Sequence, residues 1–118
     1  MNFPEAVAAG FRNYVNFSGR ASRSEYWYWT LFYILVAVAT ALIDAALNTS
    51  LLNPIASLAL FLPSLSVAVR RLHDVDRSGW WFLLILIPLI GAIILLVWYC
   101  TRGTPGPNRF GPDPLGGM

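Results

Sequence analysis

Residues 26–43, YWYWTLFYILVAVATALI, form a continuous run without a charged side chain. Two further runs, residues 45–69 and 78–101, share this composition and are rich in Leu, Ile, Val, Ala and aromatic residues. A helix needs about 20 mainly apolar residues to cross the roughly 30 Å hydrocarbon core of a bilayer. The sequence therefore predicts an all-α integral membrane protein with a single membrane domain. Its three predicted transmembrane helices span residues 23–47, 51–69 and 78–100.

The overall composition points to the bilayer as well. Apolar residues make up 57% of the chain and charged residues 12%, whereas soluble domains hold about 45–50% and about 25%. The formal net charge of +2 is too small for a nucleic-acid-binding surface. The single cysteine, Cys100, excludes an intramolecular disulfide and a thiolate-rich metal site.

Local motifs mark where the helices begin and bend. Ser22 and Glu25 have the spacing of a capping box, which predicts the start of the first transmembrane helix nearby. Pro63 and Pro88 fall inside the second and third apolar runs. Each proline removes a backbone donor, so a kink is predicted at both places.

The arginine distribution predicts the orientation in the membrane. With three crossings, six arginines share one side and two lie on the other. The positive-inside rule places the larger group in the cytoplasm. The N-terminus is then predicted to be cytoplasmic and the C-terminus periplasmic. The six arginines are Arg12, Arg20, Arg23, Arg70, Arg71 and Arg77, and the two are Arg102 and Arg109.

The two flanking segments differ from the apolar runs. Residues 3–18 carry apolar side chains at helical spacing, and polar residues occupy the other faces. This pattern predicts an amphipathic helix that lies flat at the cytoplasmic interface. Residues 101–118 are rich in Gly and Pro, which predicts an irregular tail.

Two polar stretches, residues 17–27 and 70–81, meet at the cytoplasmic face in this topology. Glu25 and Asp74 are expected to pair with arginines of the opposite stretch and to lock the helices together. Alternatively, the surplus positive charge binds an anionic lipid headgroup or an acidic segment of a membrane partner. The candidate binding residues are Arg20, Arg23, Glu25, Arg70, Arg71, His73, Asp74 and Arg77.

Two other ionisable residues have open interpretations. His73 either makes a structural hydrogen bond or acts as a proton switch, and its surroundings in sequence lack the ligands of a zinc site. Asp44 lies near the outer end of the first transmembrane helix. It is expected to be a hydrated carboxylate, and the alternative is a buried ion or proton site.

Five short motifs, which are given at the end of this paragraph in their order along the chain, resemble those of the YhaI-like bacterial inner-membrane proteins, the family called domain of unknown function 805. The resemblance runs from Phe11 to Pro114 and implies a polytopic inner-membrane protein without an established activity. It also allows an ordered tail, in which residues 108–114 either fold back against the outer face or, if the topology is inverted or a span is re-entrant, join the polar stretches. The motifs are FSGR at 17–20, RSEYW at 23–27, RRLHD at 70–74, RSGW at 77–80 and NRFGPDP at 108–114.

The sequence contains no catalytic motif, so neither an enzyme nor a cofactor is expected. The favoured hypothesis is an interaction or scaffold protein that binds anionic lipid or a membrane partner. The alternative is a subunit of an oligomeric transporter or channel, with copies that meet along Ala37, Ala41 and Ala45. The first hypothesis is favoured because the charged residues lie at the ends of the spans.

Overall fold

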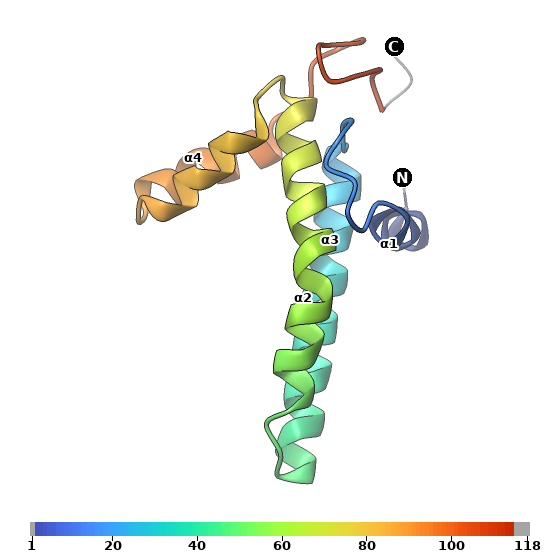
Figure 1. Cartoon of the computed structure of the whole chain (residues 1–118), viewed down its shortest axis with the longest axis vertical. Helices are drawn as coiled ribbons and strands as arrows, with labels where there is room; N and C mark the ends of the chain where they lie inside the picture. Colours follow the sequence, from blue (N-terminus) through green and yellow to red (C-terminus); the bar gives the residue numbers. More distant parts are fainter. Residues whose placement is uncertain (1, 115–118) are drawn as a thin grey trace.

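The computed structural model describes residues 2–114, and this part of the chain is helical without a β-strand. Two long antiparallel helices, α2 and α3, form the long axis of the molecule (Figure 1). Near one end of this pair, α1 lies on one side, and a hairpin made of η1 and α4 projects on the other (Figure 1). The bounds are Phe3–Arg12 for α1, Arg23–Leu47 for α2, Leu52–Asp74 for α3, Gly79–Leu86 for the 3-10 helix η1 and Ile90–Cys100 for α4.

Helix α2 has the bounds that the sequence predicts, but only half of the predicted capping box forms. The Ser22 hydroxyl accepts a hydrogen bond from the Glu25 amide at 3.3 Å. The Glu25 carboxylate pairs with Arg70 of α3 instead of reaching back to the Ser22 amide. A residue expected to stabilise a helix end locally therefore links two helices.

The turn between α2 and α3 is organised by Asp44, which is only 5% exposed. Its carboxylate accepts hydrogen bonds from the Thr49 hydroxyl at 2.9 Å and from the amides of Leu52 at 3.0 Å and Asn53 at 2.9 Å. These amides begin α3 and have no partner within their own helix. The expectation of a hydrated carboxylate is wrong, because Asp44 is buried as the cap of α3.

Helix α3 is longer than predicted. The sequence places its end at residue 69, where the apolar run stops, but the helix continues through Arg70, Arg71 and His73 to Asp74. These residues are buried and bonded to other segments, so the last turn is held by tertiary contacts. Pro63 lies inside the continuous helix and is buried.

The third apolar run does not form the single helix predicted over residues 78–100. It forms η1, a break that contains Pro88, and α4. At about 2.0 Å per residue for η1 and about 1.5 Å for α4, each limb is about 16 Å long, half the hydrocarbon thickness. Within residues 2–114, only α2 and α3 are long and apolar enough to cross a membrane.

The two limbs fold back on each other at the break. Leu89 has a positive φ of 64°. A Cβ atom on Gly91 would lie 1.7 Å from the carbonyl oxygen of Leu84, so only glycine lets the limbs approach this closely. Farther along, the rings of Trp81 and Trp98 meet edge to face at 5.7 Å. Residues 79–100 are therefore called the η1–α4 hairpin below.

Helix α1 ends at Arg12, whereas the sequence predicts a helix over residues 3–18. The carbonyl oxygens of Asn13 and Asn16 accept hydrogen bonds from the Ser66 hydroxyl of α3, at 2.7 and 2.6 Å. The chain leaves the helix here because its carbonyls bond α3. Figure 1 shows α1 end-on, so it runs across the α2–α3 pair.

Candidate functional site

Asp74 lies at the centre of a buried polar network where α3 ends. One carboxylate oxygen accepts from Arg20, with the closest nitrogen at 2.9 Å, and the other accepts from Arg71 at 2.6 Å. The three side chains are at most 3% exposed. Buried charges are tolerated only when they are paired and hydrogen-bonded. The sequence-predicted pair between Asp74 and an arginine of the opposite stretch is present.

Arg20 also bonds the C-terminal tail. Its Nη1 donates to the carbonyl of Gly106 at 2.6 Å, and its Nη2 donates to the carbonyl of Thr104 at 2.5 Å. The Thr104 amide donates to the Asp74 carbonyl at 2.7 Å. A Cβ atom on Gly103 would lie 2.0 Å from an Asp74 carboxylate oxygen, so the tail packs directly on the network.

Arg71 ties α3 to the end of the η1–α4 hairpin. Its Nε donates to the carbonyl of Tyr99 at 3.3 Å, and its Nη2 donates to the carbonyl of Thr101. The Trp27 indole of α2 donates to the same Tyr99 carbonyl at 3.1 Å. The last turn of α4 is thereby held against α2 and α3.

Glu25 and Arg70 form the second buried pair, with 2.5 Å between Oε2 and Nη1. Arg70 Nε donates to the Ser66 hydroxyl at 3.3 Å. Its buried Nη2 has no hydrogen-bond partner among residues 2–114. The Ala21 amide donates to the Arg70 carbonyl at 2.9 Å. Below, the buried arginine cluster means the three buried ion pairs together, formed by Arg20, Glu25, Arg70, Arg71 and Asp74.

His73 lies beside this cluster and holds the distal part of the tail. Its Nδ1 is 2.8 Å from the carbonyl of Gly19, and because a carbonyl can only accept, Nδ1 carries the proton. The imidazole stacks on the ring of Phe110 at 4.0 Å and 1°. Asn108 donates to the His73 carbonyl at 2.9 Å. These contacts match the structural role considered for this histidine.

The remaining two candidate residues lie outside the buried cluster. Arg23 is exposed and donates to the carbonyl of Cys100 at 3.3 Å. Arg77 is exposed, and its guanidinium carbon lies 4.8 Å from the centre of the Trp98 ring. The two arginines therefore flank the last turn of α4, and they are the exposed arginines among the eight candidate residues.

The position of the C-terminal tail differs from the one that the sequence predicts. Opposite sides of the membrane were predicted for the C-terminus and the polar stretches, yet tail residues contact Arg20 and His73. The cause is the break at Pro88, which returns the chain to the end from which the hairpin starts. The carbonyls of Tyr99, Thr101, Thr104 and Gly106 were not foreseen as parts of the site, and the family-like motif at 108–114 was the only signal for them.

An open groove of about 530 Å³ lies beside Arg23. On one face of α2, Arg23, Trp27 and Leu31 follow one another at intervals of four residues, so they form a line from charged to apolar. Ser24 and Tyr28 run parallel to them, and Cys100 completes the opposite wall. This region is called the Arg23 groove.

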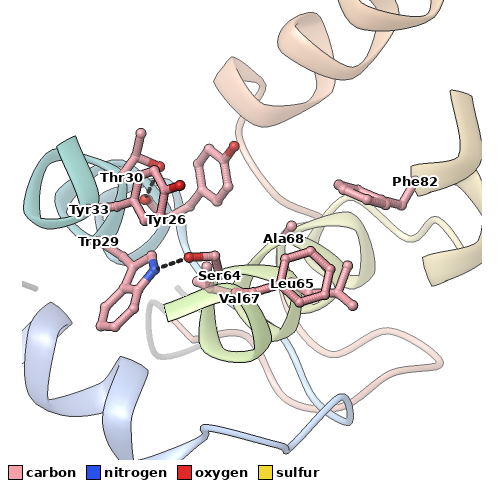
Figure 2. Close-up of a pocket in the computed structure, with 10 residues that line it drawn as sticks. Tyr26, Trp29, Thr30, Tyr33, Ser64, Leu65, Val67, Ala68 and Phe82 are labelled. Carbon is pink, nitrogen blue, oxygen red and sulfur yellow. Dashed lines mark hydrogen bonds between the residues drawn. The ribbon is translucent and has the colours of Figure 1, made fainter. Parts of the chain in front are cut away.

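A second groove, of about 270 Å³, lies between α2, α3 and η1. Figure 2 shows Phe82 of η1 opposite Tyr26 and Trp29 of α2, with Ser64 of α3 between them. The Trp29 indole donates to the Ser64 hydroxyl at 3.0 Å, which leaves the lining without a free indole donor. No charged side chain lines this groove, so it has no group that selects a headgroup.

The sequence matches a family described as Protein of unknown function (DUF805) over residues 14–112. The chain is 51% identical over 105 residues to Inner membrane protein YhaI of Escherichia coli (strain K12), which covers 87% of this chain and 89% of that protein. It is 49% identical over 109 residues to Inner membrane protein YhaH of the same strain, covering 87% and 90%. No solved structure matches it.

Proposed function

Because the chain belongs to the DUF805 family, we propose that it is a bacterial inner-membrane protein that binds anionic phospholipid through Arg23, at the cytoplasmic face. The family itself has no established activity. The observation that carries the proposal is the Arg23 groove, where a positive charge, interfacial aromatic rings and an apolar wall follow one another.

The proposed topology has two crossings, α2 and α3, with the η1–α4 hairpin entering one leaflet and returning. It is supported by the contacts between the tail and Arg20, which require both to be on one side. In this topology every arginine of the chain lies on that side, and the opposite side has only the short turn near residue 50. All eight arginines are then on one side, whereas the three-crossing topology places six on one side and two on the other. The positive-inside rule therefore supports a cytoplasmic location of the arginine-bearing side more strongly in the two-crossing topology.

The buried arginine cluster serves this function indirectly. Arg20, Arg70 and Arg71 are buried and bond carboxylates, a hydroxyl and backbone carbonyls, and the Arg70 Nη2 that lacks a partner is buried as well, so these arginines do not face the lipid. Their contacts fix the end of α4 beside α2. This fixed end is the wall of the Arg23 groove that carries Cys100.

The groove has the polarity of a phospholipid. Leu31 lies eight residues after Arg23, which is about 12 Å along the helix axis. A headgroup phosphate at Arg23 would accept charge-assisted hydrogen bonds, and Ser24 would add a hydroxyl donor. Trp27 and Tyr28 would lie at the glycerol level, where aromatic rings prefer to be, and Leu31 would contact the acyl chain. Arg77, at the other side of the last turn of α4, adds positive potential for anionic headgroups.

The alternative function, a subunit of an oligomeric transporter or channel, has less support. Asp44 is engaged as a helix cap, and Glu25 is paired with Arg70. Neither carboxylate is left to bind a transported ion. Ala41 and Ala45 are exposed, but small residues alone do not define a pathway.

The lipid-binding proposal is tested by native mass spectrometry of protein taken from bilayers that contain phosphatidylcholine and phosphatidylglycerol. The wild type is expected to retain phosphatidylglycerol preferentially, and Arg23→Gln is expected to lose this preference. Arg109→Gln is the matched control, because Arg109 is exposed on the same side but bonds Asp76 away from the groove. An Arg23→Gln protein that retains phosphatidylglycerol like the wild type would contradict the proposal.

The topology is tested by labelling single cysteines with a membrane-impermeant thiol reagent in a Cys100→Ser background. Ser50→Cys is expected to react from the periplasm, and Arg109→Cys only from the cytoplasm. Labelling of both positions from the same side would contradict the two-crossing topology.

A further inference from the structure

The breadth of the molecule changes along the α2–α3 pair. In the half nearer the arginine end, Gly10 of α1 packs against the Trp29 ring of α2, and Tyr14, just after α1, donates to the carbonyl of Ala59 near the middle of α3. On the other side of the pair, Leu95 of α4 packs with Leu72 of α3 in one buried cluster. Three of the five helical elements in residues 2–114 thus lie beside this half of the pair (Figure 1).

The half that leads to the turn carries none of these elements. Leu42 and Leu47 of α2 are 66% and 64% exposed, and Ile55 and Leu58 of α3 are 61% and 76% exposed. Figure 1 shows this half as two helices alone. Such exposed apolar side chains are stable against the acyl chains of a bilayer, which are as apolar as leucine.

The added elements are suited to one leaflet and not to water. Each limb of the η1–α4 hairpin is about 16 Å long, close to half of the roughly 30 Å hydrocarbon core. The tip residues Leu86 and Leu89 are 75% and 73% exposed. Such an exposed apolar tip is stable in acyl chains and unstable in water.

Helix α1 is amphipathic and lies at a similar depth. Phe11 presents an exposed ring, while Glu5 and Arg12 are polar and exposed. The Phe11 ring of α1 packs on Trp29 and Phe32 of α2, which follow Arg23 by six and nine residues, or about 9 and 14 Å along the helix axis, so α1 lies in the arginine-bearing half of the pair. Amphipathic helices insert about 5–10 Å into the boundary between headgroups and acyl chains.

From this distribution we propose that the protein has a wedge shape that is broader in the cytoplasmic leaflet. The inserted protein then partitions preferentially into membrane whose cytoplasmic face is convex. This inference rests on the two-crossing topology proposed above but not on lipid binding at Arg23. Two helices occupy the periplasmic leaflet, while up to five elements occupy the cytoplasmic one. Each helix is about 10 Å wide, so the area displaced differs strongly between leaflets. A leaflet that is convex has more space between its headgroups and accommodates the broader half at lower cost.

The experiment measures sorting between giant vesicles and the narrow tubes pulled from them, made of phosphatidylcholine and phosphatidylglycerol. A small dye is attached at Ser50→Cys in a Cys100→Ser background, and an impermeant quencher reports which side faces out. With the cytoplasmic side outward, the protein density in the tube is expected to exceed that in the vesicle. With the cytoplasmic side inward, the wild type is expected to be depleted from the tube. Sorting that does not reverse with orientation would overturn the proposal.

Matched variants locate the effect in the hairpin. Leu86→Asn with Leu89→Asn makes the hairpin tip polar and is expected to bring the density ratio close to one. Leu47→Asn with Leu51→Asn makes residues of similar exposure polar at the other end of the pair, and is expected to preserve the sorting. An equal loss in both variants would overturn the proposal.

Two further readouts separate this proposal from other outcomes. Arg23→Gln is expected to lose phosphatidylglycerol and still sort, so failure of lipid binding and failure of the wedge are distinguishable. Photobleaching of the dye is expected in single steps. Two-step bleaching that becomes single-step in the Leu86→Asn, Leu89→Asn variant would show that a second copy covers the hairpin, and would overturn the proposal.

Discussion

The two ends of the α2–α3 pair both bury carboxylates, but they satisfy them differently. At the turn, Asp44 accepts from groups no more than nine residues away. At the arginine end, Asp74 accepts from Arg20, 54 residues away, and Arg20 in turn donates to Gly106, 86 residues away. The first arrangement closes a turn, whereas the second holds together the segment before α2, the end of α3 and the tail.

The short-range contacts of Asp44 stabilise one turn, whereas the long-range contacts at the arginine end stabilise the whole fold. The Asp44 contacts involve backbone amides of a helix start, which every helix exposes. The contacts at the arginine end involve charges that have been removed from water, so each depends on all its partners. Damage to the turn should remain local, while damage to the arginine end should be felt throughout the molecule.

The largest effect is expected for Asp74→Ala. It leaves Arg20 and Arg71 buried without a carboxylate, and loss of one partner of a buried pair costs about 3–5 kcal/mol. The free energy of unfolding is measured in bilayers by steric trapping. Asp76→Ala is the control, because Asp76 also pairs with an arginine but is exposed. An equal decrease of the free energy of unfolding in the two variants would contradict the idea that the buried pairs stabilise the protein more than the exposed pair does.

The next effect is expected for the Glu25 and Arg70 pair. Glu25→Gln leaves one buried arginine, Arg70, without its carboxylate and should cost about 3 kcal/mol. Arg70→Met in the wild type should have a similar cost, since Glu25 is then unpaired. In the double variant both charges are gone, so its loss should be smaller than the sum of the single losses. Additive losses in this double-mutant cycle would show that the pair is not coupled.

A smaller and local effect is expected for Asp44→Ala. The amides of Leu52 and Asn53 lose their acceptor, so their hydrogen exchange should become faster. The Thr104 amide, which bonds Asp74 at the arginine end, should exchange as in the wild type. Faster exchange at Thr104 would mean that the two ends are coupled after all.

The smallest effect is expected for Arg109→Ala. Its pair with Asp76 has a separation of 3.2 Å, but both side chains are exposed. Exposed pairs contribute about 0–1 kcal/mol, so the free energy of unfolding should change within that range. A larger loss would show that the tail depends on this surface contact as well as on Arg20.

The sequence predicts some elements well and others poorly, for a common physical reason. The bounds of α2 follow from an apolar run with a Ser22 cap, both of which are local signals. The residues 78–100 are just as apolar, and Pro88 indicates only that the helix is disturbed. Whether the chain bends or turns back depends on the contact of Gly91 with Leu84 and on the anchoring of Tyr99 by Arg71. Hydropathy contains no information about such contacts.

By itself, the sequence determined that the chain is a helical membrane protein of the DUF805 family, with charged side chains restricted to the ends of its apolar runs. It also indicated that Glu25 and Asp74 would pair with arginines of the opposite stretch. Only the tertiary structure decided that the third run turns back and that the tail completes the site. The reason is that Arg20 and Arg71 are satisfied largely by backbone carbonyls, which every residue has, so only the path of the chain selects which ones they bond.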